Sequence, residues 1–308
     1  MFSVNLSKRI KGLLKYKELF LMSLPGIIVI FTFSYIPMYG LVLPFKNYRY
    51  DLGFWKSPWI GFQNFMFLFN SDNAVRITKN TLLLNCTFII ALLIISVGIA
   101  VLLNELSRKS IKVFQTAMFF PYFLSWVVVG YVFLGMFDMQ HGLLNNILLS
   151  LGRDPILWYN DPKYWPVILP VTYVWKNAGY YAIIYYAGIL SIDKELYEAA
   201  DLDGASKPQQ IKRITLPQIT PLISIMVLLQ VGKIFTGNFD MIYNVTRNSA
   251  LLYPATDVVD TFVYRSLKTM GDIGMSSAAG IYQSLVGFIL VFVSNSIIKR
   301  INPDNALF

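Results

Sequence analysis

The sequence predicts an all-α integral membrane protein with six transmembrane helices and both termini in the cytoplasm. Composition, long apolar runs and the placement of lysine and arginine predict this class. Of the 308 residues, 56% are hydrophobic and 14% are charged, whereas a soluble domain is about 45–50% apolar and about 25% charged. Too few polar residues remain to cover a surface that faces water. The high hydrophobicity excludes disorder, and the single cysteine, Cys86, excludes a disulfide-stapled fold.

Six segments are long and apolar enough to be transmembrane helices, which need about 20 mostly apolar residues. They are residues 19–43, 80–104, 113–137, 164–190, 216–237 and 277–298. Their continuous apolar composition fits helices rather than the alternating strands of a membrane β-barrel. Pro25, Pro37, Pro121 and Pro170 lie within or near these segments, and we expect kinks there, serving helix packing or acting as a gating hinge.

The first segment follows five basic residues, as the apolar core of a signal peptide would. Its apolar run exceeds the 7–15 residues of such a core, and Tyr35-Ile36-Pro37 stands where a cleavage site would lie. We therefore expect an uncleaved helix. A basic tail (residues 1–17), a six-helix domain (18–299) and a short tail (300–308) complete the predicted organisation.

The distribution of basic residues predicts the orientation, because basic loops resist translocation. Lysine and arginine are denser in the two tails and in loops 105–112 and 191–214 than in loops 44–79, 138–163 and 238–276. The first set is therefore expected in the cytoplasm. This bias also accounts for the net charge of +9, and no basic face of a soluble domain points to nucleic acid.

The first outer loop, 44–79, is rich in aromatic residues, among them Tyr50, Trp55 and Trp59. Amphipathic rings commonly lie at the level of the lipid headgroups. An interfacial aromatic belt is one interpretation, and a docking surface for an external partner is the other.

The predicted cytoplasmic loop 191–214 has the signals of two short helices joined by a glycine. Asp193 can cap a helix over 194–202, and Gly204 can end it in a left-handed conformation. Ser206 and Gln209 form a capping-box pattern for a second helix. Leu196, Ala199 and Ala200 share one face of the first helix. Such a small apolar face beside a membrane is suited to insertion into a cleft on a partner.

The same loop carries a spaced family motif. Glu198-Ala199-Ala200, Gly204, Ile214 and Leu216-Pro217 match the EAA–G–I–LP signature of importer-type ABC permeases. The chain also resembles the carbohydrate-uptake branch of that family in LPGIIVIFTFSYIPMYG, GFQNF and FFPYFLSW. Within the branch it looks most like permeases for oligosaccharides from complex polysaccharides. The resemblance implies a type I importer fold and import by alternating access.

The resemblance also implies partners. The loop would be a coupling elbow that docks on a separate ATPase through Glu198, Ala199, Ala200, Asp201, Gly204, Ile214, Leu216 and Pro217. A second, homologous permease would complete the pore, in a heterodimer, and an external solute-binding protein would deliver the sugar. The location would be a bacterial inner membrane. ATP and magnesium would bind to two ATPase subunits, and this chain would need no cofactor; it contains no phosphate-binding loop of the G-x-x-x-x-G-K-[ST] type.

Two lysines inside predicted spans, Lys176 and Lys233, suggest a polar path, because an intramembrane charge usually faces a cavity or a partner. Aromatic faces and amide donors near them suit sugars. The candidate path residues are Tyr122, Trp126, Trp175, Lys176, Asn177, Tyr180, Tyr181, Gln230, Lys233 and Asn238. The alternatives are that the rings fill helix contacts and that Lys233 extends to the headgroups. Paired lysines lead to the hypothesis that the sugar is acidic and contains uronates.

No catalytic or metal-binding constellation is visible in the sequence, and His141 is its only histidine. We therefore expect a transport subunit and not an enzyme. A permease for another small polar solute is the nearest alternative. An ion-coupled carrier would show more spans and repeats, and a membrane-embedded enzyme would show an intramembrane cluster of His, Asp or Glu.

Overall fold

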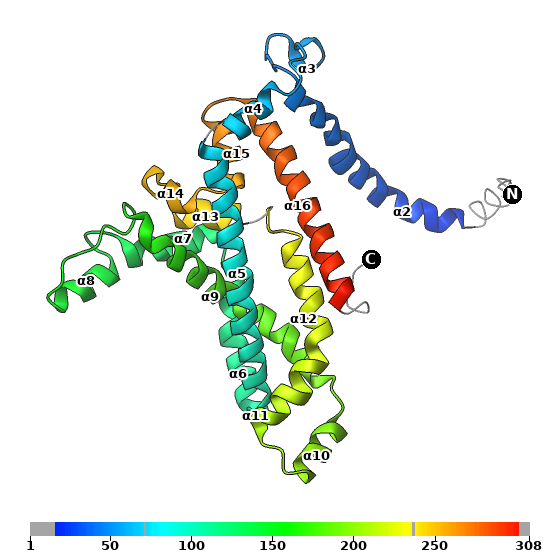
Figure 1. The fold of residues 1–308 in the computed structure, drawn as a ribbon, viewed down its shortest axis with the longest axis vertical. Coiled ribbons are helices and arrows are strands. Elements are labelled where there is room, and N and C mark those ends of the chain that lie inside the picture. The colour runs from blue at the N-terminus through cyan, green and yellow to red at the C-terminus, as the bar shows by residue number, and fades with distance from the viewer. Residues whose placement is uncertain (1–15, 71, 236–237, 302–308) are drawn as a thin grey trace.

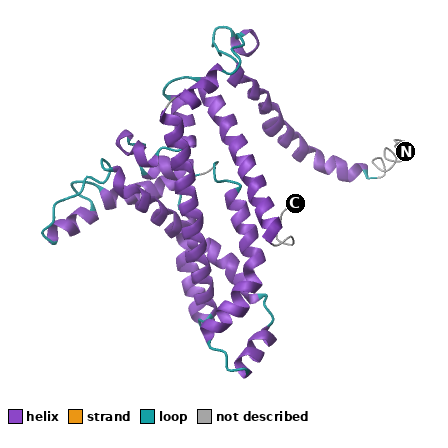
Figure 2. Ribbon diagram, viewed as in Figure 1, coloured by secondary structure: helices purple, strands orange, loops and turns teal. Residues whose placement is uncertain are grey.

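The computed structural model describes residues 16–70, 72–235 and 238–301. These residues are almost entirely helical (Figure 2) and contain no β-strand; an isolated antiparallel bridge joins Lys46 to Trp59. The predicted all-α class is therefore confirmed. The predicted tails, 1–17 and 300–308, lie largely outside the described residues.

The first predicted span is one continuous helical segment. It consists of α2 (Lys17–Ile30), a π-helical turn η1 (Phe31–Tyr35) and a 3₁₀ segment η2 (Ile36–Phe45). Pro25 lies inside α2 and Pro37 lies in the first turn of η2. Proline has no N–H to donate, so regular α-helical bonding is disturbed there. No residue of α2 is buried, and the segment diverges from the other helices (Figure 1).

The first outer loop folds into a small knob with α3 (Gly53–Lys56) and α4 (Gln63–Asn70). Lys46 lies inside it and donates to the carbonyl oxygens of Phe54 at 2.8 Å and Trp55 at 3.2 Å. The rings of Trp55 and Trp59 stay exposed. This arrangement is compatible with both interpretations of the aromatic loop.

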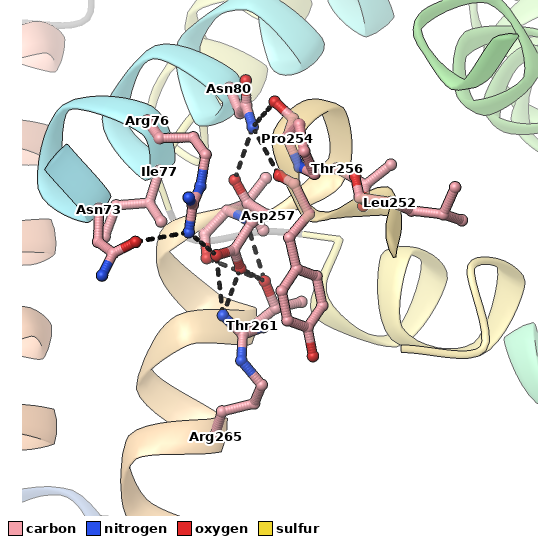
Figure 3. Close-up of polar contacts among 12 residues, drawn as sticks. Asn73, Arg76, Ile77, Asn80, Leu252, Pro254, Thr256, Asp257, Thr261 and Arg265 are labelled. Carbon is pink, nitrogen blue, oxygen red and sulfur yellow. Dashed lines mark hydrogen bonds and ion pairs between the residues drawn. The ribbon is translucent and has the colours of Figure 1, made fainter. Parts of the chain in front are cut away.

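The second span, α5 (Asp72–Asn104), begins well before the predicted start at residue 80. Its polar first turns pack on the outer corner formed by α14 (Tyr253–Thr256) and α15 (Val259–Lys268). Figure 3 shows Arg76 of α5 and Arg265 of α15 converging on Asp257. The side chain of Asp257 has no exposed surface. Hydropathy does not assign these turns to the span, because their residues are polar. They can be polar because other parts of the protein, and not lipid, surround them.

The third predicted span, 113–137, is not one straight helix. It is split into α6 (Arg108–Phe119), η3 (Phe120–Phe123) and α7 (Trp126–Phe137), with a bend of 97° between the two halves. Pro121 breaks the helical bonding. Leu124 and Ser125 are extended, with ψ of 135° and 153°, and the Ser125 hydroxyl accepts from the backbone N–H of Val128 to cap α7. A continuous helix over 113–137 is therefore wrong, because local capping restarts the helix in a new direction, while the kink expected at Pro121 is present.

The bounds of α9 (Trp165–Leu190) agree with the fourth predicted segment, whereas those of the fifth helix differ from the prediction. The fifth helix begins as α11 (Lys207–Gln210), continues through η5 (Ile211–Thr215) and α12 (Leu216–Val231), and ends before the predicted 237. It starts early because the capping box at Ser206 opens a helix that runs on into the span. A turn after Val231 ends it.

The sixth predicted segment lies within α16 (Ile273–Ile301), which begins before and ends after the predicted bounds of 277 and 298. The remaining elements are α8 (Leu143–Ser150), η4 (Pro162–Tyr164), α10 (Lys194–Leu202), α13 (Phe239–Val245) and η6 (Ala250–Leu252). Among the described residues, four helices are long and apolar enough to cross a membrane: 17–45, 73–104, 207–231 and 273–296. The bent pair α6–η3 and α7 gives a fifth.

The core is built around α5, which packs most extensively on α9. One apolar cluster joins α5, α7, α9 and α13 through residues such as Phe88, Val129 and Trp165. A second, with Ile77, joins α5 to α15 and α16. A third, with Tyr185, joins α5, α9 and α12 near the elbow. The long helices are therefore fixed to one another, while α2 is not fixed to any of them by buried residues.

Candidate functional site

The loop 191–214 forms the predicted helix–glycine–helix elbow and lies at the bottom of the molecule in Figure 1. Asp193 caps α10 by accepting from the backbone N–H of Glu195 at 3.0 Å. Gly204 follows α10 with φ +73°, a left-handed conformation that side chains with a Cβ rarely adopt. Ser206 and Gln209 form the predicted capping box. The predicted shape of the elbow is thus confirmed.

The outward surface of α10 carries the Glu-Ala-Ala part of the motif. Glu198 and Ala199 are exposed, and Ala200 is half-buried. Leu196 is 43% exposed and Leu202 is 91% exposed. Sequence reasoning placed Leu196 on the docking face but missed Leu202. The signal in the sequence that could have identified Leu202 is its position at the end of an otherwise polar helix.

Buried polar contacts hold the elbow rigid. Gln210 is 3% exposed, and its amide donates to the carboxylate of Asp201 and to the carbonyl oxygen of Ala205 at 3.3 Å. The hydroxyls of Tyr197 and Thr215 lie 2.9 Å apart and are hydrogen-bonded. These contacts tie α10 to the helix that leads into the fifth span. Asp201, a predicted docking residue, therefore also braces the elbow, although it is exposed.

A cavity of about 360 Å³ lies in the bend of the elbow, and Gly204, Gln210, Arg213 and Ile214 are among its lining residues. Leu216 and Pro217 begin α12, where Leu216 packs against the third apolar cluster. The spaced motif therefore divides into an exposed part on α10 and a part that shapes the bend. Gln210 was not found from the sequence because a glutamine in a polar loop has no distinctive pattern.

Four of the predicted path residues of the third and fourth spans lie around the break between η3 and α7: Tyr122, Trp126, Lys176 and Tyr180. Lys176 is 6% exposed, and its ammonium donates to the carbonyl oxygen of Tyr122 at 2.6 Å. The rings of Tyr122 and Tyr180 stack with centroids 4.5 Å apart. Trp126 places its ring 5.1 Å from the Lys176 nitrogen. Sequence spacing identified these residues, but only the fold shows that Lys176 contacts backbone carbonyls.

The other path residues of α9 have separate surroundings. Trp175 is 43% exposed and lies 6.4 Å from the ring of Phe133. Asn177 donates to the carbonyl oxygen of Tyr173 one turn earlier, at 2.8 Å. Tyr181 is half-buried and meets Tyr180 edge to face. These side chains follow one another around α9 and do not converge on a single point.

The path residues of the fifth span lie near a second helix break, after α12. The amide atoms of Gln230 are buried and have no hydrogen-bond partner within the described part of the chain. Lys233 is exposed in the turn that follows. Asn238 has φ +83° and donates to Asn85 of α5 at 2.9 Å. The second break is thus tied to α5, as the first is tied to α9.

The helical architecture and the braced elbow with its EAA pattern define a membrane permease. The family described as "Binding-protein-dependent transport system inner membrane component" matches residues 87–303. The chain belongs to this family and is a permease subunit of an ABC importer, a transport component rather than an enzyme. The family resemblance predicted from the sequence is confirmed.

Two curated relatives come from Bacillus subtilis (strain 168). Protein LplB is 33% identical, over 94% of this chain and 90% of its own length. The polygalacturonan/rhamnogalacturonan transport system permease protein YteP is 32% identical, over 95% and 91%. The structure of a bacterial ABC transporter that imports the acidic polysaccharide alginate has a chain with a TM-score of 0.88 and 32% identity. The match covers 96% of this chain and all of that one. A further structure, with a TM-score of 0.86, holds the alginate transporter in complex with an alginate pentasaccharide-bound periplasmic protein.

Proposed function

We propose that this chain forms half of the pore of an ATP-driven importer of acidic, uronate-containing oligosaccharides. The observation that carries the proposal is the agreement with the alginate importer over nearly the whole chain. The polygalacturonan/rhamnogalacturonan permease, named for uronate-containing polymers, supports the same substrate class. The proposed location is a bacterial inner membrane.

We infer six spans with both termini in the cytoplasm. α9 has 26 residues, so its length is about 39 Å at 1.5 Å per residue, enough to cross the hydrocarbon core. Its polar residues keep its mean hydropathy low, because one side of it faces protein. Adding α9 to the four apolar helices and the bent pair gives six spans in one domain, residues 18–299. The basic residues of the loop 191–214 support a cytoplasmic elbow.

Three kinds of protein partner follow in the proposal. A second, homologous permease would cover α2, which has no buried residue and diverges from the other helices of this chain. Two ATPase subunits, which hold ATP and magnesium, would receive the exposed face of α10. A solute-binding protein outside would deliver the sugar, as the alginate complex supports.

The proposed mechanism is alternating access. Closure of the ATPases moves the elbow as a rigid body, because Gln210 and Tyr197 fasten α10 to the fifth span. The sugar then passes the two helix breaks. In this proposal Lys233 supplies a cation to the uronate groups: it is exposed, and its ammonium group makes no ion pair within the described ranges. Trp175, Tyr181 and Gln230 supply ring faces and an amide.

The first test is purification of the tagged chain from its native membrane in mild detergent, followed by mass spectrometry. We expect a second permease and an ATPase to co-purify. The complex, with its binding protein, is then reconstituted in proteoliposomes that contain ATP. Unlabelled uronate pentasaccharide should compete with labelled uronate pentasaccharide for uptake, whereas a neutral pentasaccharide should not. Recovery of the chain alone, with a control complex intact, would contradict the importer; equal competition by both sugars would contradict the acidic substrate.

A further inference from the structure

The break in the third span leaves backbone oxygens that the helix does not fully satisfy. Because Leu124 and Ser125 are extended, α7 does not continue the helical bonding of η3. The Pro121 oxygen accepts one backbone bond, from Leu124 at 3.2 Å. In the interior of a membrane domain, an unpaired carbonyl is costly, since no bulk water replaces the missing donor. A break at this place therefore needs a donor from a neighbouring element.

Lys176 of α9 supplies that donor. Its ammonium donates to the carbonyl oxygen of Tyr122 at 2.6 Å and to that of Pro121 at 3.4 Å. Its nitrogen also lies 5.3 Å from the ring centre of Tyr122 and 5.1 Å from that of Trp126. One ring precedes the break and the other follows it. A single side chain thus contacts both halves of the bent span.

The charge of Lys176 is compensated without a carboxylate. Among the described residues it forms no salt bridge. The carbonyl end of a helix carries partial negative charge, and aromatic faces attract cations. The carbonyl end of α6–η3 and the two rings together provide a site for one ammonium group. Lys176 is 6% exposed, so this site is closed and not an open surface for a ligand.

The neighbouring residues of α9 fix the distance from Lys176 to the break. A Cβ added to Gly179 would lie 2.0 Å from the carbonyl oxygen of Met118, so the backbones of α9 and α6 are in direct contact. Tyr180 stacks on Tyr122 with an interplanar angle of 7°. The ammonium is therefore held in place by close packing on its own helix.

We propose that Lys176 is a positioning residue, which holds the 97° bend of the third span and so sets where Tyr122 and Trp126 stand. It acts on the sugar path through these rings and does not contact the sugar. The part of this proposal that concerns the sugar path rests on the proposed function. The part that concerns the bend does not, because the bend can be measured without any substrate.

The structural test is pulsed electron paramagnetic resonance on the full chain with its co-purifying subunits. Cys86 is replaced by serine, and spin labels are attached at Val113→Cys on α6 and Val132→Cys on α7, both exposed. A reference pair, Leu102→Cys and Leu190→Cys, reports on α5 and α9. We expect Lys176→Met to broaden the 113–132 distance distribution at least twofold or shift it by several ångströms. The reference pair should not change, and Lys176→Arg should keep the native distribution.

An unchanged 113–132 distribution in Lys176→Met overturns the proposal. If Lys176→Met disturbs both label pairs or cannot be purified, the Lys176→Arg variant decides. A native 113–132 distribution in Lys176→Arg supports the need for a cationic donor, and loss of the native distribution in that variant overturns the proposal.

Uptake supplies the second readout. We expect Lys176→Met to reduce uptake of a uronate pentasaccharide and of its partly methyl-esterified form, which carries fewer charges, by the same factor. A loss of uptake that grows with the number of free carboxylates would make Lys176 a substrate ligand instead. If the wild type transports neither sugar, the proposed function fails and the distance measurement still decides this inference.

Discussion

At the scale of single residues, the structure separates charges that the sequence treats alike. Lys176 and Lys233 are both lysines in predicted spans, yet one is buried against carbonyl oxygens and the other is exposed in a turn. Asp257 and Asp51 differ in the same way. Asp257 is fully buried between two arginines, while Asp51 forms an exposed pair with Arg49. The burial of each charge therefore decides what its removal costs.

Substitution of Asp257 tests this distinction. Arg265 donates to both carboxylate oxygens of Asp257 at 2.8 Å, and Thr261 donates to one of them at 3.0 Å. Asp257→Ala leaves Arg265 without its partner, and breaking a buried pair costs about 3–5 kcal/mol. We expect a clear drop in the melting temperature of the purified protein. Asp51→Ala, the matched surface control, should leave it unchanged; equal melting temperatures for the two variants would show that the Asp257 cluster does not brace the outer corner.

At the scale of elements, glycines allow pairs of helices to approach closely where they meet. Gly179 brings α9 against α6, and Gly130 brings α7 against α13, where an added Cβ would lie 2.6 Å from the carbonyl oxygen of Asn244. The sequence predicted the positions of most helices from their apolar runs. It predicted a kink near Pro121 but not a bend as large as 97°, and it did not predict the early start of the fifth helix. Those features depend on Pro121, Ser125 and Ser206 acting on local hydrogen bonds, which hydropathy does not record.

Alanine at Gly179 is the sharpest test of this contact. Its Cβ would overlap the Met118 carbonyl, and overpacking typically costs about 1–3 kcal/mol, here against backbone that cannot rotate away. Gly98→Ala, in α5 with open space around it, is the control. That variant removes a helix-interior glycine and should be neutral or stabilising by up to about 1 kcal/mol. Thermal unfolding in detergent measures both; a Gly179→Ala protein as stable as Gly98→Ala would refute the close approach.

At the scale of the whole molecule, the fixed bundle and the unfixed α2 fit a chain that works as part of a complex. The exposed Leu196 and Leu202 at the elbow point to the same conclusion. An isolated protein would leave both the elbow face and the long α2–η2 segment uncovered. The assembly, rather than this chain alone, is thus the proposed functional unit.

Glu198→Ala tests the elbow as the coupling element in that assembly. Glu198 is exposed on α10, so its removal should leave the fold and melting temperature unchanged. Truncation of an interface hot-spot residue costs at least about 2 kcal/mol, and each 1.4 kcal/mol weakens the contact roughly tenfold. We expect sugar uptake and transport-coupled ATP hydrolysis to fall several-fold or more. Glu195→Ala, in the first turn of the same helix, is the control; normal coupling in Glu198→Ala would assign docking to another surface.

The sequence by itself determined the membrane class, the family and the shape of the elbow. Each depends on local features, namely long apolar runs, the spaced motif and capping residues such as Asp193 and Ser206, which act within a few positions along the chain. Only the tertiary structure decided three long-range or buried contacts. Lys176 donates hydrogen bonds to the carbonyl oxygens of the third span, Asp257 pairs with two arginines, and Gln210 joins the two helices of the elbow. These contacts join residues that lie far apart in the sequence or across a turn. Their energies depend on burial and donor geometry, which exist only after the helices have packed.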